Sequence, residues 1–366
     1  MRVRDPSKEV LMRNNRVWFW DCKIQNRDNR LSLRWMLGCL ALPILAALAC
    51  VPAEAQCTAY VPTHKSNTVA VIDTVVDRVV AVIPVQIQPL AVAITPNGAF
   101  AYVTNSGWIF GSNSVSVIAT TSNTVVATIP VGNFPVGVAI TPSGAFAYVA
   151  NLNSNSVSVI STATNTVTAT IAVGTGPWGL AITPNGAFAY VTNLNSNNVS
   201  VIDTASNGVV ATVPVGSGPV SVAITPNGST AYVTNQSSDT VSVISSATNT
   251  VVATVPIVNG SYNSGPYAVA VAPNGAFAYV ANAAASNVSV IDTATNTVTT
   301  TIGVGSTPHG LVFTPDGALA YVTNEVSNTV SVIDTATNTV VDTVEGVVAV
   351  PEGIAITPQG SAVSCR

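Results

Sequence analysis

An internal repeat constrains this chain more than any other feature of its sequence. The phrase Thr-Pro-Asn-Gly-Ala-Phe-Ala-Tyr-Val-Thr-Asn occurs at residues 95–105 and again at 183–193, with near copies elsewhere. Its tyrosine recurs at spacings of 42, 46, 42, 42, 47 and 42 residues. A fixed period of this length indicates one supersecondary unit that is repeated along the chain. The tyrosines are Tyr60, Tyr102, Tyr148, Tyr190, Tyr232, Tyr279 and Tyr321.

Each repeat predicts four β-strands. Runs rich in Val, Ile and Thr, such as residues 136–140, 99–103, 199–202 and 125–131, alternate with Gly, Pro, Asn and Ser, as strands alternate with turns. The link Thr-Pro-Asn-Gly suits a tight turn, because Pro presets φ and Gly accepts a positive φ. One repeat therefore predicts a four-stranded antiparallel meander.

The two ends of the chain indicate how the repeats close. The repeats begin with a second strand near Tyr60 and end just after a first strand. One unit must therefore combine residues 58–85 with a first strand at 353–357, which removes the free sheet edge of an open array. A solenoid is the alternative for any repeat, but no unit has a polar capping version. We predict an all-β, seven-bladed β-propeller of four-stranded antiparallel blades, whose N- and C-terminal strands share one blade.

The repeat also carries a family signature. Tyr102-Val-Thr-Asn105 and Tyr190-Val-Thr-Asn193 recur later in the chain, next to Val-Ser-Val-Ile-Asp and a Gly-x-x-Pro turn. Over residues 57–365 the chain resembles the YVTN-repeat β-propellers of bacterial envelope and archaeal surface-layer proteins. That resemblance implies a fold but no common catalytic set. Two departures, Tyr60-Val-Pro-Thr63 and Tyr148-Val-Ala-Asn151, are expected to have no chemical consequence.

The first 55 residues predict an N-terminal extension and a secretory signal. An apolar run at 36–50 follows Arg34 and precedes Ala53-Glu54-Ala55, a pattern typical of cleavage after residue 55. The run is shorter than the roughly 20 residues of a spanning helix; the alternative is an uncleaved anchor. We expect the propeller, residues 56–366, to be secreted, periplasmic or at the cell surface, without a membrane span after cleavage.

Charge excludes one class of partner. Residues 56–366 hold three Lys or Arg residues against eleven Asp or Glu residues, a formal charge of −8. Nucleic-acid binding needs a basic surface to neutralise phosphates, so no nucleic-acid partner is expected. The same segment holds two cysteines, Cys57 and Cys365, one at each end beside the closing blade. In an exported protein this pair predicts a disulfide, with two free thiols as the alternative.

Residues suited to catalysis are scarce. The chain contains two histidines, His64 and His309, and lacks a P-loop and a Gly-x-Ser-x-Gly elbow. We therefore predict no catalytic residues, no metal site and no cofactor, and hence a protein that is not an enzyme. The predicted function is an exported, non-catalytic scaffold that binds an unknown protein or glycan at the cell envelope. The alternatives are a propeller enzyme, such as a lactone hydrolase or a quinone- or haem-dependent oxidoreductase, and a self-assembling surface-layer or adhesion protein.

A binding face is predicted from the loops that vary between repeats. The loops after the second and fourth strands open on one face, and they hold most of the irregular sequence. Function is usually placed on variable loops held by a rigid scaffold. The alternative is that these aromatic side chains only pack over the loops. The candidate binding residues are Trp108, Phe110, Phe134, Trp178, Tyr262, Tyr267, His309 and His64.

Overall fold

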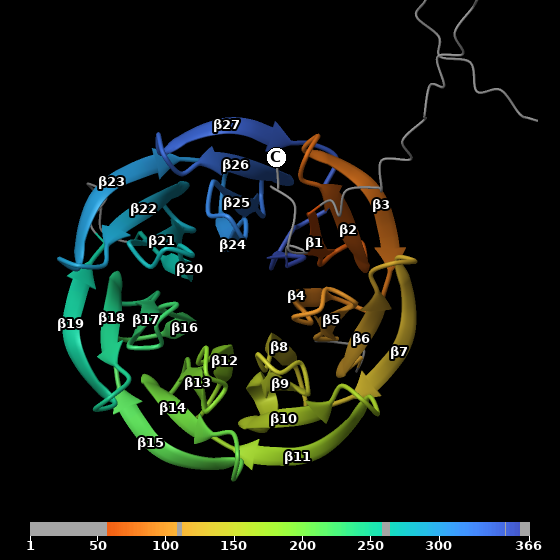
Figure 1. The fold of residues 1–366 in the computed structure, drawn as a ribbon, viewed down its shortest axis with the longest axis horizontal. Helices are drawn as coiled ribbons and strands as arrows, with labels where there is room; N and C mark the ends of the chain where they lie inside the picture. Colours follow the sequence, from red (N-terminus) through yellow and green to blue (C-terminus); the bar gives the residue numbers. More distant parts are fainter. Residues whose placement is uncertain (1–56, 108–111, 258–263, 348, 359–366) are drawn as a thin grey trace, which may run out of the picture. The chain divides into compact units, whose positions relative to one another are not determined.

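The computed structural model describes residues 57–107, 112–257, 264–347 and 349–358. They belong to the compact unit that comprises residues 51–366. Seven four-stranded antiparallel sheets stand in a ring (Figure 1). Residues of their inner strands line a central cavity, which we call the channel. This confirms the prediction of an all-β, seven-bladed propeller. No helix among the described residues is long and apolar enough to cross a membrane.

The blades share one order of strands. In the second blade β4 (Pro89–Ile94) lies at the channel, followed outward by β5 (Phe100–Asn105), β6 (Ser114–Ala119) and β7 (Thr124–Pro130) (Figure 1). The next five blades begin with β8, β12, β16, β20 and β24 in turn. Their strands are β8 (Pro135–Ile140), β9 (Phe146–Asn151), β10 (Ser156–Ser161), β11 (Thr166–Ala172), β12 (Pro177–Ile182), β13 (Phe188–Asn193), β14 (Asn198–Asp203), β15 (Gly208–Pro214), β16 (Pro219–Ile224), β17 (Thr230–Asn235), β18 (Thr240–Ser245), β19 (Thr250–Pro256), β20 (Pro266–Val271), β21 (Phe277–Asn282), β22 (Asn287–Asp292), β23 (Thr297–Gly303), β24 (Pro308–Phe313), β25 (Leu319–Asn324), β26 (Thr329–Asp334) and β27 (Thr339–Val344). A short 3-10 turn, η1 (Leu152–Ser154), follows β9.

The remaining blade joins the two ends of the chain, as predicted. It contains β1 (Thr58–Thr63), β2 (Thr68–Asp73), β3 (Arg78–Pro84) and the C-terminal strand β28 (Ala355–Ile356), in the order β28-β1-β2-β3. Ala59 pairs with Ile356 and Tyr60 with Ala355. Because β28 takes the inner position, this blade presents the same first-strand surface to the channel as the others.

The repeated tyrosines are buried between the blades, and each one ties its blade to the next. The hydroxyl of Tyr102 donates to Oδ1 of Asn165, 2.8 Å away in the following blade. Asn165 adopts a left-handed conformation in the outer hairpin turn, which asparagine tolerates well. At the joint Tyr321 donates instead to the carboxylate of Asp77, at 2.5 Å. The ring is therefore closed by a hydrogen bond to a carboxylate.

The threonine of the repeated phrase makes a second link, nearer the channel. The Thr323 hydroxyl accepts a hydrogen bond from the Gly310 amide, at 2.7 Å, and donates to the carbonyl of Glu352 in the next blade, at 2.5 Å. Thr104, Thr192 and Thr234 make the same link to the next blade. Ala150 and Ala281 occupy this position in two blades and have no hydroxyl. The expectation that the departure at residues 148–151 is without chemical consequence is therefore wrong.

Two further predictions concern residues at the edge of the described part. Cys57 is buried beside β1, while Cys365 lies outside the described residues, so the disulfide stays a prediction. The predicted extension and signal at residues 1–55 also lie outside the described residues.

Candidate functional site

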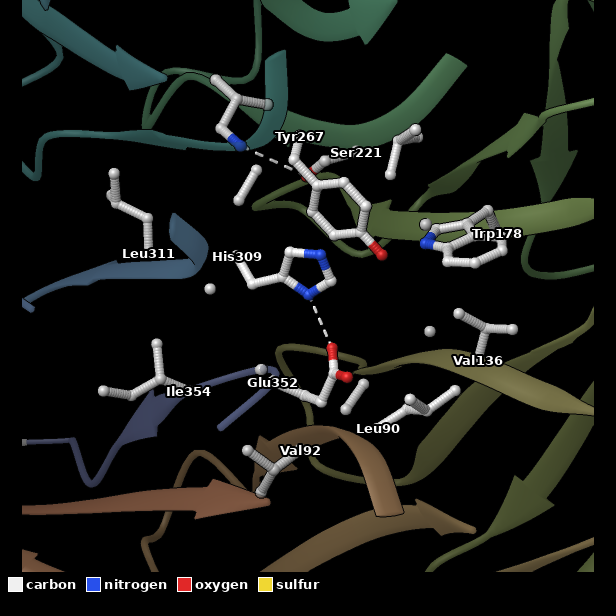
Figure 2. Close-up of a pocket in the computed structure, with 18 residues that line it drawn as sticks. Leu90, Val92, Val136, Trp178, Ser221, Tyr267, His309, Leu311, Glu352 and Ile354 are labelled. Atoms are coloured by element: carbon white, nitrogen blue, oxygen red, sulfur yellow. Dashed lines mark hydrogen bonds and ion pairs between the residues drawn. The ribbon is translucent and has the colours of Figure 1, made fainter. Parts of the chain in front are cut away.

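Seven side chains, one from each blade, surround the channel. Every first strand is preceded by or begins with a proline, and the residue after that proline lines a cavity of about 210 Å³. Figure 2 shows several of these side chains converging from different blades: Leu90, Val136, Trp178, Tyr267, His309 and Glu352. We call this set the channel ring. Its members are Leu90, Val136, Trp178, Val220, Tyr267, His309 and Glu352.

Close backbone packing holds the channel ring in place. The residue after each ring member is Ala, Gly or Ser, because the inner strands of adjacent blades approach closely here. A Cβ atom at Gly179 would lie 2.3 Å from the carbonyl oxygen of Val220, and one at Gly310 would lie 2.5 Å from that of Glu352. These distances are below van der Waals contact, so only glycine fits there.

The channel ring divides into two arcs. The apolar arc consists of Leu90, Val136, Trp178 and Val220, from four successive blades. The polar arc consists of Tyr267, His309 and Glu352, from the next three blades. A small molecule in this cavity therefore meets hydrocarbon on one side and hydrogen-bonding groups on the other.

His309 and Glu352 form a closely hydrogen-bonded pair across the joint of the ring. Nδ1 of His309 lies 2.6 Å from Oε2 of Glu352, and their side chains are 15% and 12% exposed (Figure 2). Nε2 of His309 lies 3.6 Å from Oε2 of Glu325, which directly follows β25. A carboxylate at Nδ1 fixes the tautomer that leaves a lone pair on Nε2. The geometry suits a histidine that accepts a proton at Nε2.

Tyr267 covers one face of the imidazole. Its ring stacks on His309 with centroids 3.8 Å apart and planes 12° from parallel. It meets the Trp178 ring edge-on, with centroids 6.3 Å apart. Burial first, and then the charge of Glu352, raises the pKa of the Tyr267 phenol, and a hydrogen bond with Trp178 only partly opposes this. The phenol therefore keeps its proton and remains a hydrogen-bond donor.

The second histidine lies on the other side of the joint. His64 directly follows β1, and its amide donates to the carbonyl of Val350 at 2.9 Å. Burial lowers the pKa of His64, although the carboxylates of Glu352 and Glu325 oppose the shift. His64 is therefore mainly neutral at pH 7. Both histidines and two of the three glutamates in residues 57–358 thus gather at one end of the channel.

The structure brings together only part of the predicted binding set. Trp178, Tyr267 and His309 belong to the channel ring, and His64 lies close to it. Phe134 is buried in the turn before β8 and does not line the cavity. Trp108, Phe110 and Tyr262 lie outside the described residues.

Sequence reasoning missed part of the ring, although a signal was present. The binding set omitted Glu352 and the aliphatic members of the apolar arc. Each of them directly follows the proline that marks a first strand, so a comparison of that position across the repeats would have found them. Among the described residues no three His, Cys, Asp or Glu side chains are grouped to hold a metal ion.

Comparison with known families agrees with the fold and identifies a family. The family described as "Lactonase, 7-bladed beta-propeller" matches residues 58–170 and 180–304, which together exceed half of the chain. The chain belongs to this lactonase family. A second family, described as a YNCE-like beta-propeller, matches residues 264–360. Membership of the YVTN-repeat family stays a prediction.

Similar solved structures were also found. Hydrazine synthase from Kuenenia stuttgartiensis is 26% identical, with a TM-score of 0.61 over 67% of this chain and 76% of that one. A functionally unknown protein from Desulfotomaculum acetoxidans DSM 771 (20% identity, TM-score 0.71) and a putative 6-phosphogluconolactonase from Bacteroides fragilis NCTC 9343 (18%, 0.69) each cover 83% of this chain and 99% of their own. These last two show the fold alone. No curated protein sequence matches significantly.

The family match overturns one prediction. The scarcity of ionisable residues led us to predict that the protein is not an enzyme, and membership of a lactonase family contradicts this. The physical reason is that a low number of ionisable residues in the whole chain does not show whether those few residues lie close together in the fold. The few suitable side chains meet in the channel, where His309 contacts Glu352.

Proposed function

We propose that this protein is a hydrolase that opens a lactone by adding water, with the reaction taking place in the channel ring. The observation that carries the proposal is the His309–Glu352 pair, 2.6 Å apart, inside a cavity that also presents the Tyr267 phenol. Membership of the lactonase family supports the choice of a cyclic ester as substrate.

His309 acts as the general base. Glu352 accepts a hydrogen bond from the N–H at Nδ1, which leaves the lone pair on Nε2. Nε2 then takes a proton from a water molecule as the water oxygen attacks the carbonyl carbon of the lactone. The imidazolium that forms lies between the carboxylates of Glu352 and Glu325, which stabilise its charge. The same proton then passes to the ring oxygen as the C–O bond breaks, which yields a hydroxy acid.

Tyr267 stabilises the oxygen on which charge develops. Its phenol keeps its proton because burial raises its pKa, so it donates a hydrogen bond to the carbonyl oxygen during attack. A donor placed where negative charge appears lowers the barrier more than it favours the bound substrate. The edge-on contact with the Trp178 ring holds the phenol in place.

Titration at constant pH tests this proposal by following acid release from γ-butyrolactone, δ-valerolactone and their alkyl-substituted derivatives. We expect the full chain to accelerate hydrolysis of at least one of them. We also expect His309→Asn and Glu352→Gln to lower kcat by about 10²- to 10⁴-fold, the range for a general base. Glu345→Gln is the matched control, because Glu345 is an exposed glutamate that does not line the cavity. Equal rates for the wild type and His309→Asn would refute the proposal.

A further inference from the structure

We infer that the channel ring selects an uncharged lactone with a hydrocarbon substituent, and that it discriminates against phosphorylated or carboxylated lactones. This inference rests on the proposed function for the identity of the reacting group. It goes further by assigning the parts of the substrate to the two arcs: the ester lies at the polar arc and the substituent at the apolar arc.

Charge is the first argument. Among the described residues Lys65 and Arg78 are the only Lys or Arg residues, and neither lines the cavity. Glu352 does line it, and Glu325 lies 3.6 Å from His309. Tight recognition of phosphate or carboxylate relies on charge-assisted hydrogen bonds from Arg or Lys. An anionic group in the cavity would meet carboxylates instead.

The basic side chains beside the cavity, Lys65 and His64, do not make its net charge positive. Lys65 is exposed and follows His64, on the loop after β1. It is the one Lys or Arg among the electrostatic neighbours of His64, which also include Glu352, Glu325 and His309. Because burial lowers the pKa of His64, that side chain adds little positive charge at pH 7. The single positive charge of Lys65 is therefore outweighed by the two negative charges of Glu352 and Glu325.

The apolar arc is the second argument. The apolar arc, made of Leu90, Val136, Trp178 and Val220, presents hydrocarbon from four successive blades without a charged side chain among them. Figure 2 shows Leu90, Val136 and Trp178 on this side of the cavity. A substituent that lies against them leaves water, which strengthens binding by about fourfold for each buried methylene. The cavity of about 210 Å³ suits a small ring with a short chain.

Lactams test this inference directly, because they resemble lactones in shape and resist hydrolysis. Isothermal titration calorimetry of the full chain at pH 7 would use 2-piperidone, 6-butyl-2-piperidone and 6-oxopiperidine-2-carboxylate. We expect the butyl compound to bind at least tenfold more tightly than 2-piperidone, and the carboxylate more weakly than either. Leu90→Ser should reduce the ratio of the affinity for the butyl compound to the affinity for 2-piperidone. Val80→Ser, on the outer strand β3, is the control and should preserve that ratio.

The outcomes separate this inference from the proposed function. Binding of the carboxylate as tight as that of the butyl compound, or an advantage of the butyl group that survives Leu90→Ser, would overturn the inference. A lack of binding by all three lactams would overturn it as well. The expected order of affinities without hydrolysis of any lactone would refute the proposed reaction and keep the ligand class. If the protein hydrolysed an anionic lactone faster than the uncharged ones, the proposed reaction would be supported and the inferred preference for uncharged lactones would be refuted.

Discussion

The closure of the ring by Tyr321 and Asp77 leads to a quantitative prediction. Tyr321→Phe removes one hydroxyl, which donates at 2.5 Å to the buried carboxylate of Asp77. Tyr190→Phe removes the equivalent hydroxyl, which donates at 2.8 Å to the neutral amide of Asn249. Hydrogen bonds to charged groups contribute about 1.5–3 kcal/mol to stability, and those to neutral groups about 0.5–1.5 kcal/mol. Tyr321→Phe should therefore lower the free energy of unfolding by about 1 kcal/mol more than Tyr190→Phe does.

Guanidinium unfolding followed by circular dichroism measures both losses in the same way. The two substitutions remove the same atom from the same position of the repeat, so the transfer free energy of the hydroxyl cancels in the comparison. Hydrogen exchange gives a second readout, because weaker closure should raise exchange in β1 and β28 before the other blades. Equal losses for the two variants would refute the claim that the joint depends on a charged acceptor.

Two further predictions rest on contacts of Thr323 and His64, and a third rests on the two cysteines of the propeller segment. Thr323→Val breaks the link between the Gly310 amide and the Glu352 carbonyl, so kcat for lactone opening should fall about tenfold or more with KM nearly unchanged. Thr323→Ser keeps the hydroxyl and should keep kcat close to that of the wild type. Thr192→Val breaks the equivalent link between Gly179 and Val220 and should leave kcat unchanged. If Thr192→Val lowered kcat as much as Thr323→Val does, that result would contradict a positioning role for Thr323. The folded-state pKa of His64 lies below its ordinary value of 6.5, so the unfolded chain binds more protons as the pH falls below 6.5 and the folded protein loses stability there. His64→Gln should flatten this part of the stability profile measured by thermal unfolding, and an unchanged slope would count against the burial of a neutral histidine. Mass spectrometry of the unreduced protein should find Cys57 linked to Cys365, and two free thiols would end that prediction.

The fold could be predicted from sequence because the repeat specifies it many times over. The repeat has a period near 42 residues and two tight turns in each unit, and its first copy begins with a second strand. These features together are consistent with a closed ring. The place of β28 beside β1 follows from the same reasoning, since the last first strand must replace the one that is missing from the first blade. The inter-blade role of the tyrosine hydroxyl was not predicted, because its acceptor lies about 60 residues away in the next unit.

The site was harder to predict because it depends on contacts between blades. His309 and Glu352 are 43 residues apart and meet because each follows the marker proline of its own blade. Their shared register is visible in the sequence, but the 2.6 Å approach of Nδ1 to the carboxylate depends on side-chain rotamers and on the close packing at Gly310. The chain's low content of charged residues gave no sign that His309 and Glu352 meet in the channel, and for this reason the prediction about catalysis was wrong.

A crystal structure of the full chain with 6-butyl-2-piperidone would test the central claim most directly. The account predicts that the lactam carbonyl accepts a hydrogen bond from Tyr267, with a water molecule between its carbon and Nε2 of His309. The water oxygen should lie about 3–3.5 Å from that carbon, and the butyl chain should lie against Leu90 and Val136. A lactam bound outside the channel ring, or one whose carbonyl faces the apolar arc, would contradict the account.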